Sequence, residues 1–277
     1  MSKLVSLAER AGCNKCPCFW REGAELSTLT TYDGLSLSYT ESGEDTRRPP
    51  VVLLHGYAAD SYMNWVAPGI AGALVLGGHR VIALDARGHG QSDAPHEASF
   101  YGEATMAQDV SLLADLLGTE QFDLVGYAWG AVIALLVAGH DPRVRRLVVG
   151  GIGTEVADAS AVGRRKLRDR QLAEALRLDD EGAIADVGLR SVRRFAEQAK
   201  ADRLALAAHA EGEHAPPISL DGIGVETLVV AGEDDEYVGS PAGLAAVIGA
   251  SVALVPGDHL GAVFSKEFKS AVVKFLE

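Results

Sequence analysis

Short apolar segments rich in β-branched residues recur along this 277-residue chain, and stretches with helical character separate them. The segments are Val51–Leu54, Val81–Leu84, Phe122–Val125, Leu147–Val149, Thr227–Ala231 and Ser251–Val255. Strands that alternate with helices and are apolar on both faces form parallel sheets with helices packed on each side. The chain is therefore predicted to be an α/β protein with a mostly parallel, doubly wound sheet.

Further elements follow from the spacing of apolar residues. Between Ala104 and Leu117, and again between Ser265 and Leu276, these residues fall three and four apart, which predicts two helices packed against the sheet. Upstream of the parallel part, Leu35, Leu37 and Tyr39 alternate with other residues and predict a strand or a hairpin.

The alternation of strands and helices stops over residues 154–220, where the composition becomes helical. The chain is predicted to consist of an N-terminal extension (1–27), a core (28–153 and 221–277) and a helical cap (154–220) inserted into that core. The cap contains a basic cluster of Arg164, Arg165, Lys166, Arg168 and Arg170. This cluster either attracts an acidic substrate or is a solvated helix face.

The composition indicates which binding partners and which cellular compartment to expect. A formal charge of −13 disfavours binding to nucleic acid or to anionic membranes. The longest apolar run, Ala131 to Gly139, is about half the ~20 residues that cross a bilayer. Cys13, Cys16 and Cys18 are too close together to form a disulfide framework, and a zinc site there would lack a fourth ligand. We expect a cytoplasmic protein without a metal, and the role of the cysteines stays open.

A strand-turn-helix frame surrounds Ala128. The segment from Leu124 to Ala131 reads Leu-Val-Gly-Tyr-Ala-Trp-Gly-Ala, so that a buried strand runs into a helix across two glycines that flank one central residue. This pattern is typical of a nucleophile elbow. The glycines are needed because the strand and helix backbones approach closely, and the central residue takes a strained conformation. Ala128 thus occupies the position of a nucleophile.

Together with three other segments, this frame resembles the α/β-hydrolase superfamily from residue 30 to the end of the chain. A His-Gly-Tyr tripeptide ending at Tyr57 is similar to the oxyanion loop of the family. It implies that the backbone N–H groups of Tyr57 and Trp129 are the oxyanion donors. The run Leu84–Ser92 resembles a structural loop of the family. Neither His55 nor His89 is therefore expected to be the general base.

The resemblance also implies a catalytic acid and a catalytic base. The segment 229–235 resembles the strand and turn that carry the family's acid, and its register selects Asp235, with Asp234 as the alternative. His259 follows the last predicted strand, where the family has its general base. The order of Ala128, Asp235 and His259 along the chain is the order of nucleophile, acid and histidine in this fold.

Four aromatic side chains near these motifs or in the cap are expected to bind an apolar substrate, together with Leu204 and Leu206 of the cap. They are Tyr62, Trp65, Tyr127 and Phe195. The resemblance implies a hydrolase of the esterase type that acts on a small acyl compound without a cofactor. The identity of the substrate and the oligomeric state, for which a homodimer is one alternative, stay open.

An alanine cannot attack a carbonyl group, and loss of the nucleophile of such a triad costs on the order of 10⁶ in turnover. Three explanations remain open: an inactive serine-to-alanine mutant of an esterase, a natural pseudohydrolase that binds a small ligand, and an enzyme that uses only a His259–Asp235 dyad. Lyases and cofactor-free dioxygenases of the family resemble the third. In a variant of the first explanation, the original residue at position 128 is an aspartate, as in the dehalogenases and epoxide hydrolases of the family. These relatives usually have a proline soon after His-Gly, where this chain has Tyr57-Ala58-Ala59, so serine is favoured.

Overall fold

The structure is a computed structural model that describes residues 25–45, 48–158, 162–213 and 218–277, with the backbone alone for 162–166. The cysteines of the expected N-terminal extension, Cys13, Cys16 and Cys18, lie outside the described residues. Within these ranges, no helix combines the length and apolar character needed to cross a membrane.

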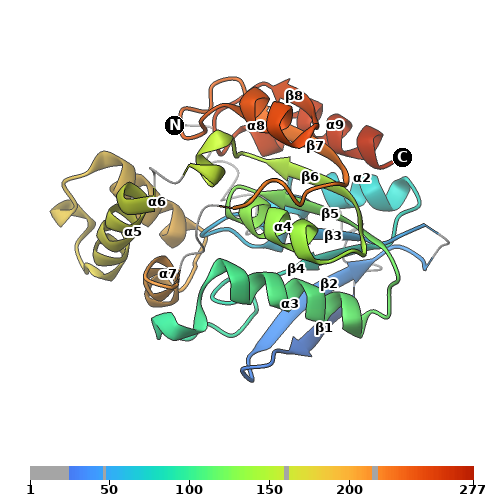
Figure 1. Cartoon of the computed structure of the whole chain (residues 1–277). Helices are drawn as coiled ribbons and strands as arrows, with labels where there is room; N and C mark the ends of the chain where they lie inside the picture. The colour runs from blue at the N-terminus through green and yellow to red at the C-terminus, as the bar shows by residue number, and fades with distance from the viewer. Residues whose placement is uncertain (1–24, 46–47, 159–161, 214–217) are drawn as a thin grey trace.

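One eight-stranded sheet organises the described chain (Figure 1). Its strands are β1 (Glu25–Thr30), β2 (Ser36–Ser42), β3 (Val51–Leu54), β4 (Val81–Leu84), β5 (Phe122–Tyr127), β6 (Val144–Gly150), β7 (Glu226–Gly232) and β8 (Ser251–Val255). The spatial order is β1-β2-β4-β3-β5-β6-β7-β8, and β1 and β2 are antiparallel to their neighbours while the other pairs are parallel. The predicted fold class, a mostly parallel sheet with helices, is confirmed.

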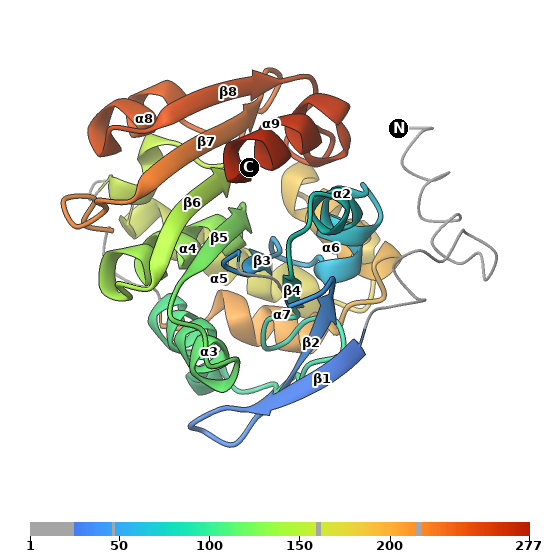
Figure 2. The same cartoon turned by 90° about the vertical axis from the view of Figure 1, so that its right-hand side faces the viewer.

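Helices cover both faces of the sheet, as Figure 2 shows. One face carries α2 (Ile70–Leu76) and α9 (Lys266–Leu276), and the other carries α3 (Glu103–Leu116), α4 (Trp129–His140) and α8 (Pro241–Ile248). Successive residues of a strand point to opposite faces. In β3, Val51 and Leu53 therefore pack with α2 and α9, whereas Val52 and Leu54 pack with α3 and α4. This is why the strand is apolar at every position.

Three helices between β6 and β7 lie together at one end of the sheet (Figure 1). They are α5 (Val162–Arg177), α6 (Val187–Gln198) and α7 (Arg203–Ala210). They pack on one another through small and apolar residues such as Leu176, Ala196 and Leu206. Leu204 was expected to face the substrate, but it is exposed, because residues two apart on a helix point in different directions. The three helices form a separate layer over the ends of the strands.

Two glycines allow β5 and α4 to meet closely. A Cβ on Gly126 would collide with the backbone of Gly130, and a Cβ on Gly130 would collide with the carbonyl oxygens of Leu54 and His55. All of these obstacles are backbone atoms, so no side chain could move aside. The start of α4 is therefore packed directly against the end of β3, and only glycine fits at the contact.

We expect Gly130→Ala to lower the free energy of unfolding by about 1–3 kcal/mol, because the added methyl group overpacks the contact between α4 and β3. Gly139→Ala is the matched control, since Gly139 lies in the same helix and a Cβ there meets nothing within 4 Å. That change should leave stability unchanged or raise it by up to about 1 kcal/mol. Urea unfolding of both variants measures the difference, and equal effects would contradict the proposed close contact.

Candidate active site

The backbone at Ala128 has the strained geometry of a tight turn between strand and helix. Its φ of 49° and ψ of −113° lie in a region that L-residues rarely occupy. The carbonyl oxygen of Ala128 accepts the N–H groups of Ala131 and Val132 in the first turn of α4. The Ala128 N–H donates to Gly150 of β6. The turn is thus held from both sides, and the methyl group faces the cavity described below.

A histidine and a carboxylate form a hydrogen-bonded pair beside this turn. His259 Nδ1 lies 2.8 Å from Oδ2 of Asp235, whose side chain is fully buried, whereas the imidazole is 23 % exposed. Because a carboxylate only accepts, Nδ1 is the donor, and in a neutral ring Nε2 carries the lone pair. The other carboxylate oxygen accepts the Tyr237 N–H at 3.1 Å. Asp234, the alternative acid, is exposed and makes no such contact among the described residues.

Tyr127 connects the histidine to the elbow. Its hydroxyl group donates to the carbonyl oxygen of His259 at 2.6 Å, and its ring packs between His259 and Phe268. Burial raises the pKa of Tyr127, so the phenol stays protonated and keeps this hydrogen bond. Because Tyr127 directly precedes Ala128, the position of the imidazole is coupled to the nucleophile position. Tyr127 was predicted as a substrate contact, and the structure adds this positioning role.

The loop after β3 crosses the elbow in van der Waals contact. A Cβ on Gly56 would lie 3.4 Å from the Ala128 methyl group. Asn64 accepts the Gly56 N–H at 2.7 Å, and His89 Nε2 accepts the Ala58 N–H at 3.2 Å. The N–H of Tyr57, between these anchors, has no acceptor among the described protein atoms. Both predicted oxyanion donors therefore flank Ala128, since Trp129 follows it as the first residue of α4.

The two loop histidines are part of the scaffold. His55 Nε2 accepts the Ala86 N–H at 3.0 Å, and His89 Nδ1 donates to the carbonyl oxygen of Arg87 at 2.9 Å. Burial, followed by the nearby His55, lowers the pKa of His89 to about 3, so this ring is neutral at ordinary pH. Both rings hold the loops after β3 and β4 together.

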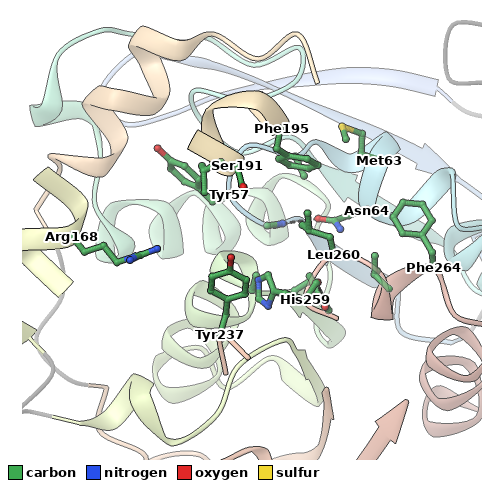
Figure 3. A pocket seen from close by; sticks show the side chains of 16 residues that line it. Tyr57, Met63, Asn64, Arg168, Ser191, Phe195, Tyr237, His259, Leu260 and Phe264 are labelled. Carbon is green, nitrogen blue, oxygen red and sulfur yellow. Dashed lines mark hydrogen bonds between the residues drawn. The ribbon is translucent and has the colours of Figure 1, made fainter. Parts of the chain in front are cut away.

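A cavity of about 310 Å³ opens above the elbow, between the strand ends and the cap (Figure 3). It is lined by Gly56, Tyr57, Ala59, Met63, Asn64, Tyr127, Ala128, Arg168, Ser191, Val192, Phe195, Tyr237, His259, Leu260, Val263 and Phe264. These residues come from the loops after β3, β5, β7 and β8 and from two cap helices. Most of the wall is apolar, and it contains no carboxylate. In the described part of the chain, no cluster of three or more His, Cys, Asp or Glu could hold a metal ion.

The structure brings most of the predicted site residues together, but not all. Tyr62 and Trp65 were predicted to contact the substrate, and neither lines the cavity. Tyr62 is exposed at the surface, and Trp65 is fully buried in the core beside β3 and α2. Both lie on one turn of π-helix, Tyr62–Val66, which instead directs Met63 and Asn64 to the cavity. The direction of each side chain on so short an element cannot be read from spacing alone.

Several residues that line the cavity were not predicted from the sequence. Tyr237 and Leu260 are close in sequence to Asp235 and His259, so proximity to the predicted acid and base would have found them. Ser191 and Val192 come from the cap and carry no recognisable motif.

Comparisons with known proteins agree with this fold. A profile of the family described as "alpha/beta hydrolase fold" matches residues 49–180. The chain is 36% identical over 125 residues to epoxide hydrolase B of Mycobacterium tuberculosis, covering 44% of this chain and 33% of that protein. It is 46% identical over 79 residues to the putative carbamate hydrolase RutD of Variovorax paradoxus, covering 28% and 29%. The chain thus matches about a third of the length of these curated relatives.

Solved structures match over almost the whole core and cap. A hydrolase from Pseudomonas aeruginosa has a TM-score of 0.73 at 28% identity, covering 91% of this chain and 98% of that one. The enol-lactonase from Burkholderia xenovorans has a TM-score of 0.70 at 25% identity, covering 90% and 99%. The profile and these structures support membership of the chain in the α/β-hydrolase superfamily.

The neutral state of His89 has a consequence for stability. Its pKa is about 3 in the folded chain and 6.5 as the ordinary value, so between these values only the unfolded chain takes up the proton. Stability should therefore fall as the pH decreases through this range, by at most about 1.4 kcal/mol per pH unit. We expect the stability difference between the unchanged protein and His89→Gln to shrink from pH 6.5 to pH 4 in urea titrations. A difference that does not depend on pH would contradict a neutral, buried His89.

Proposed function

We propose that the cavity is the active site of a hydrolase for carboxylic esters and related acyl compounds, in which Ala128 occupies the nucleophile position. One observation carries this proposal: the hydrogen-bonded pair of His259 and Asp235 opens into the same cavity as the Ala128 methyl group. The overall similarity to an enol-lactonase, which covers 90% of this chain, supports it.

With a serine at position 128, the groups around the cavity suffice for acyl transfer. His259 would accept the hydroxyl proton through Nε2, and Asp235 would hold the ring and stabilise the imidazolium. The N–H groups of Tyr57 and Trp129 would stabilise the negative oxygen of the tetrahedral intermediate. Water activated by His259 would then release the acyl group from the serine. With alanine, substrate binding remains but the covalent step is absent.

An acyl substrate is preferred over an epoxide for a structural reason. Two backbone N–H groups beside the nucleophile position are suited to the oxygen of a carbonyl group that becomes tetrahedral. The relatives named epoxide hydrolases match only part of this chain, so they support hydrolysis in general more than the epoxide substrate itself.

A second candidate function is proton abstraction by the His259–Asp235 dyad alone. The observation that favours it is the position of His259 in the wall of a cavity that Ala128 lines with a methyl group in place of a hydroxyl group. Without a serine to deprotonate, Nε2 of His259 can accept a proton directly from a bound substrate or from water. Such a reaction would proceed in the unchanged chain.

We expect Ala128→Ser to raise kcat/KM for p-nitrophenyl acetate or butyrate by about 10³-fold or more, because it supplies the missing nucleophile. Release of p-nitrophenol measures the rate. The double variant Ala128→Ser/His259→Ala is the control and should lose the gain. No gain in the single variant would contradict the proposal. Activity of the unchanged chain that His259→Ala abolishes would establish the second candidate instead.

Neighbouring aspartates provide a matched test of the acid within the Ala128→Ser variant. Asp235→Asn should lower kcat by about 10⁴-fold, because the amide favours the wrong imidazole tautomer. Asp234→Asn removes the same charge one residue away and should leave kcat unchanged, since Asp234 points to solvent. Equal losses in the two variants would reject Asp235 as the acid.

A further inference from the structure

One cationic side chain lines the cavity away from the acid–base pair. Arg168, on α5 of the cap, is the single arginine or lysine among the lining residues. The described residues that line the cavity include no carboxylate, and Asp235 lies behind His259 with a fully buried side chain. The cavity thus presents a permanent positive charge on an otherwise mainly apolar surface.

Arg168 has no hydrogen-bond or ion-pair partner among the described residues, unlike every other arginine whose side chain the structure describes. In the cap, Arg170, Arg177, Arg193 and Arg194 form ion pairs with glutamates, and Arg190 and Arg203 donate to backbone carbonyl groups. In the core, Arg48, Arg80, Arg87, Arg143, Arg145 and Arg146 are each hydrogen-bonded. The fold therefore does not use the guanidinium group of Arg168.

The surroundings of Arg168 leave its guanidinium group available. A Cβ on Gly188 would lie 3.4 Å from its Nη2 atom, so the group lies against the first turn of α6. Asp186 Oδ1 lies 3.2 Å from the same Cβ position and accepts the Leu189 N–H as a helix cap, and it forms no ion pair with Arg168 among the described side chains. In Figure 3 the side chain lies on the side of Tyr57 and at the end of the cavity opposite Phe264.

The two ends of the cavity therefore differ in chemistry. Met63 and Phe264 make one part apolar, and Arg168 makes another part cationic. The nucleophile position and His259 also face this space. A guanidinium group donates two parallel hydrogen bonds to a carboxylate, and it is the side chain best matched to that planar anion.

We infer that Arg168 determines specificity by binding a carboxylate of the substrate, so that the substrate class is an ester or lactone with a free carboxylate remote from the reacting carbonyl group. This inference rests on the proposed function of the site. The ion pair fixes which way round the molecule lies, and the apolar end holds the rest of it. Because the chain carries a formal charge of −13, an anionic substrate needs such a local cation.

The test uses matched anionic and neutral esters with the Ala128→Ser variant. One pair is p-nitrophenyl hydrogen glutarate and p-nitrophenyl valerate, with the charge on the acyl side. The other is 4-acetoxybenzoate and its methyl ester, with the charge on the leaving group. We expect Arg168→Gln to raise KM for the anionic member of at least one pair by about 10- to 100-fold, with little change in kcat. KM for the neutral members should not change.

Two further variants test whether the bidentate geometry and the position of the Arg168 guanidinium group matter, and not only its charge. Arg168→Lys keeps the charge but loses the bidentate geometry, so it should recover only part of the affinity. Arg170→Gln removes an arginine of the same helix that pairs with Glu174 outside the cavity, and it should change neither ester pair. Added salt should weaken the preference for anions, because the site is partly exposed.

Calorimetry on the unchanged chain makes the inference independent of turnover. Monomethyl glutarate should bind, and Arg168→Gln should raise its Kd by about 10- to 100-fold. Hydrolysis of neutral esters by Ala128→Ser without any effect of Arg168→Gln on the anionic probes would overturn this inference and leave the proposed function intact. Inactivity on every ester, combined with binding that depends on Arg168, would overturn the proposed function and leave a carboxylate-binding site.

Discussion

The direct backbone contact between the start of α4 and the end of β3 is the constraint on which the site depends. Gly130 allows this contact, and it brings the loop after β3 over Ala128. The neighbouring parallel strands β7 and β8 end at the same edge of the sheet, so the loops that follow them carry Asp235 and His259 to the same place. The hydroxyl group of Tyr127 then connects His259 to the elbow. The predicted acid, base and oxyanion loop are thus brought together around one tightly packed turn.

The sequence was sufficient to predict the sheet and the elbow, because both depend on local patterns. The runs predicted as β3, β4 and β8 coincide with the observed strands. β3 and β4 are buried at every position and are therefore apolar throughout, whereas the edge strand β8 buries only Val255. The walls of the cavity depend on tertiary packing and were harder to predict. Trp65 was placed in the pocket but is buried in the core, and Arg168 could not be distinguished from its basic neighbours until the cap helices were packed on the core.

On our account, the cavity contains a base, oxyanion donors and a cationic group for the substrate, but it lacks a nucleophile. In the proposed mechanism, the imidazole held by a buried carboxylate accepts a proton, and backbone N–H groups beside Ala128 stabilise an oxyanion. On our account, the guanidinium group of Arg168 in the cap selects an anionic substrate. In the proposed mechanism the alanine removes only the covalent step, which would allow binding and catalysis to be measured separately in this protein. Because His55 and His89 serve the scaffold, His259 is left as the histidine that faces the cavity.

The crystal structure of the Ala128→Ser variant after reaction with diethyl p-nitrophenyl phosphate tests the central claim most directly. Our account requires a covalent adduct on the introduced serine. Its phosphoryl oxygen should accept hydrogen bonds from the N–H groups of Tyr57 and Trp129, and Nε2 of His259 should lie beside the adduct. An unmodified serine, or an adduct whose oxygen points away from these donors, would contradict the assignment of the elbow, the oxyanion loop and the acid–base pair to one active site.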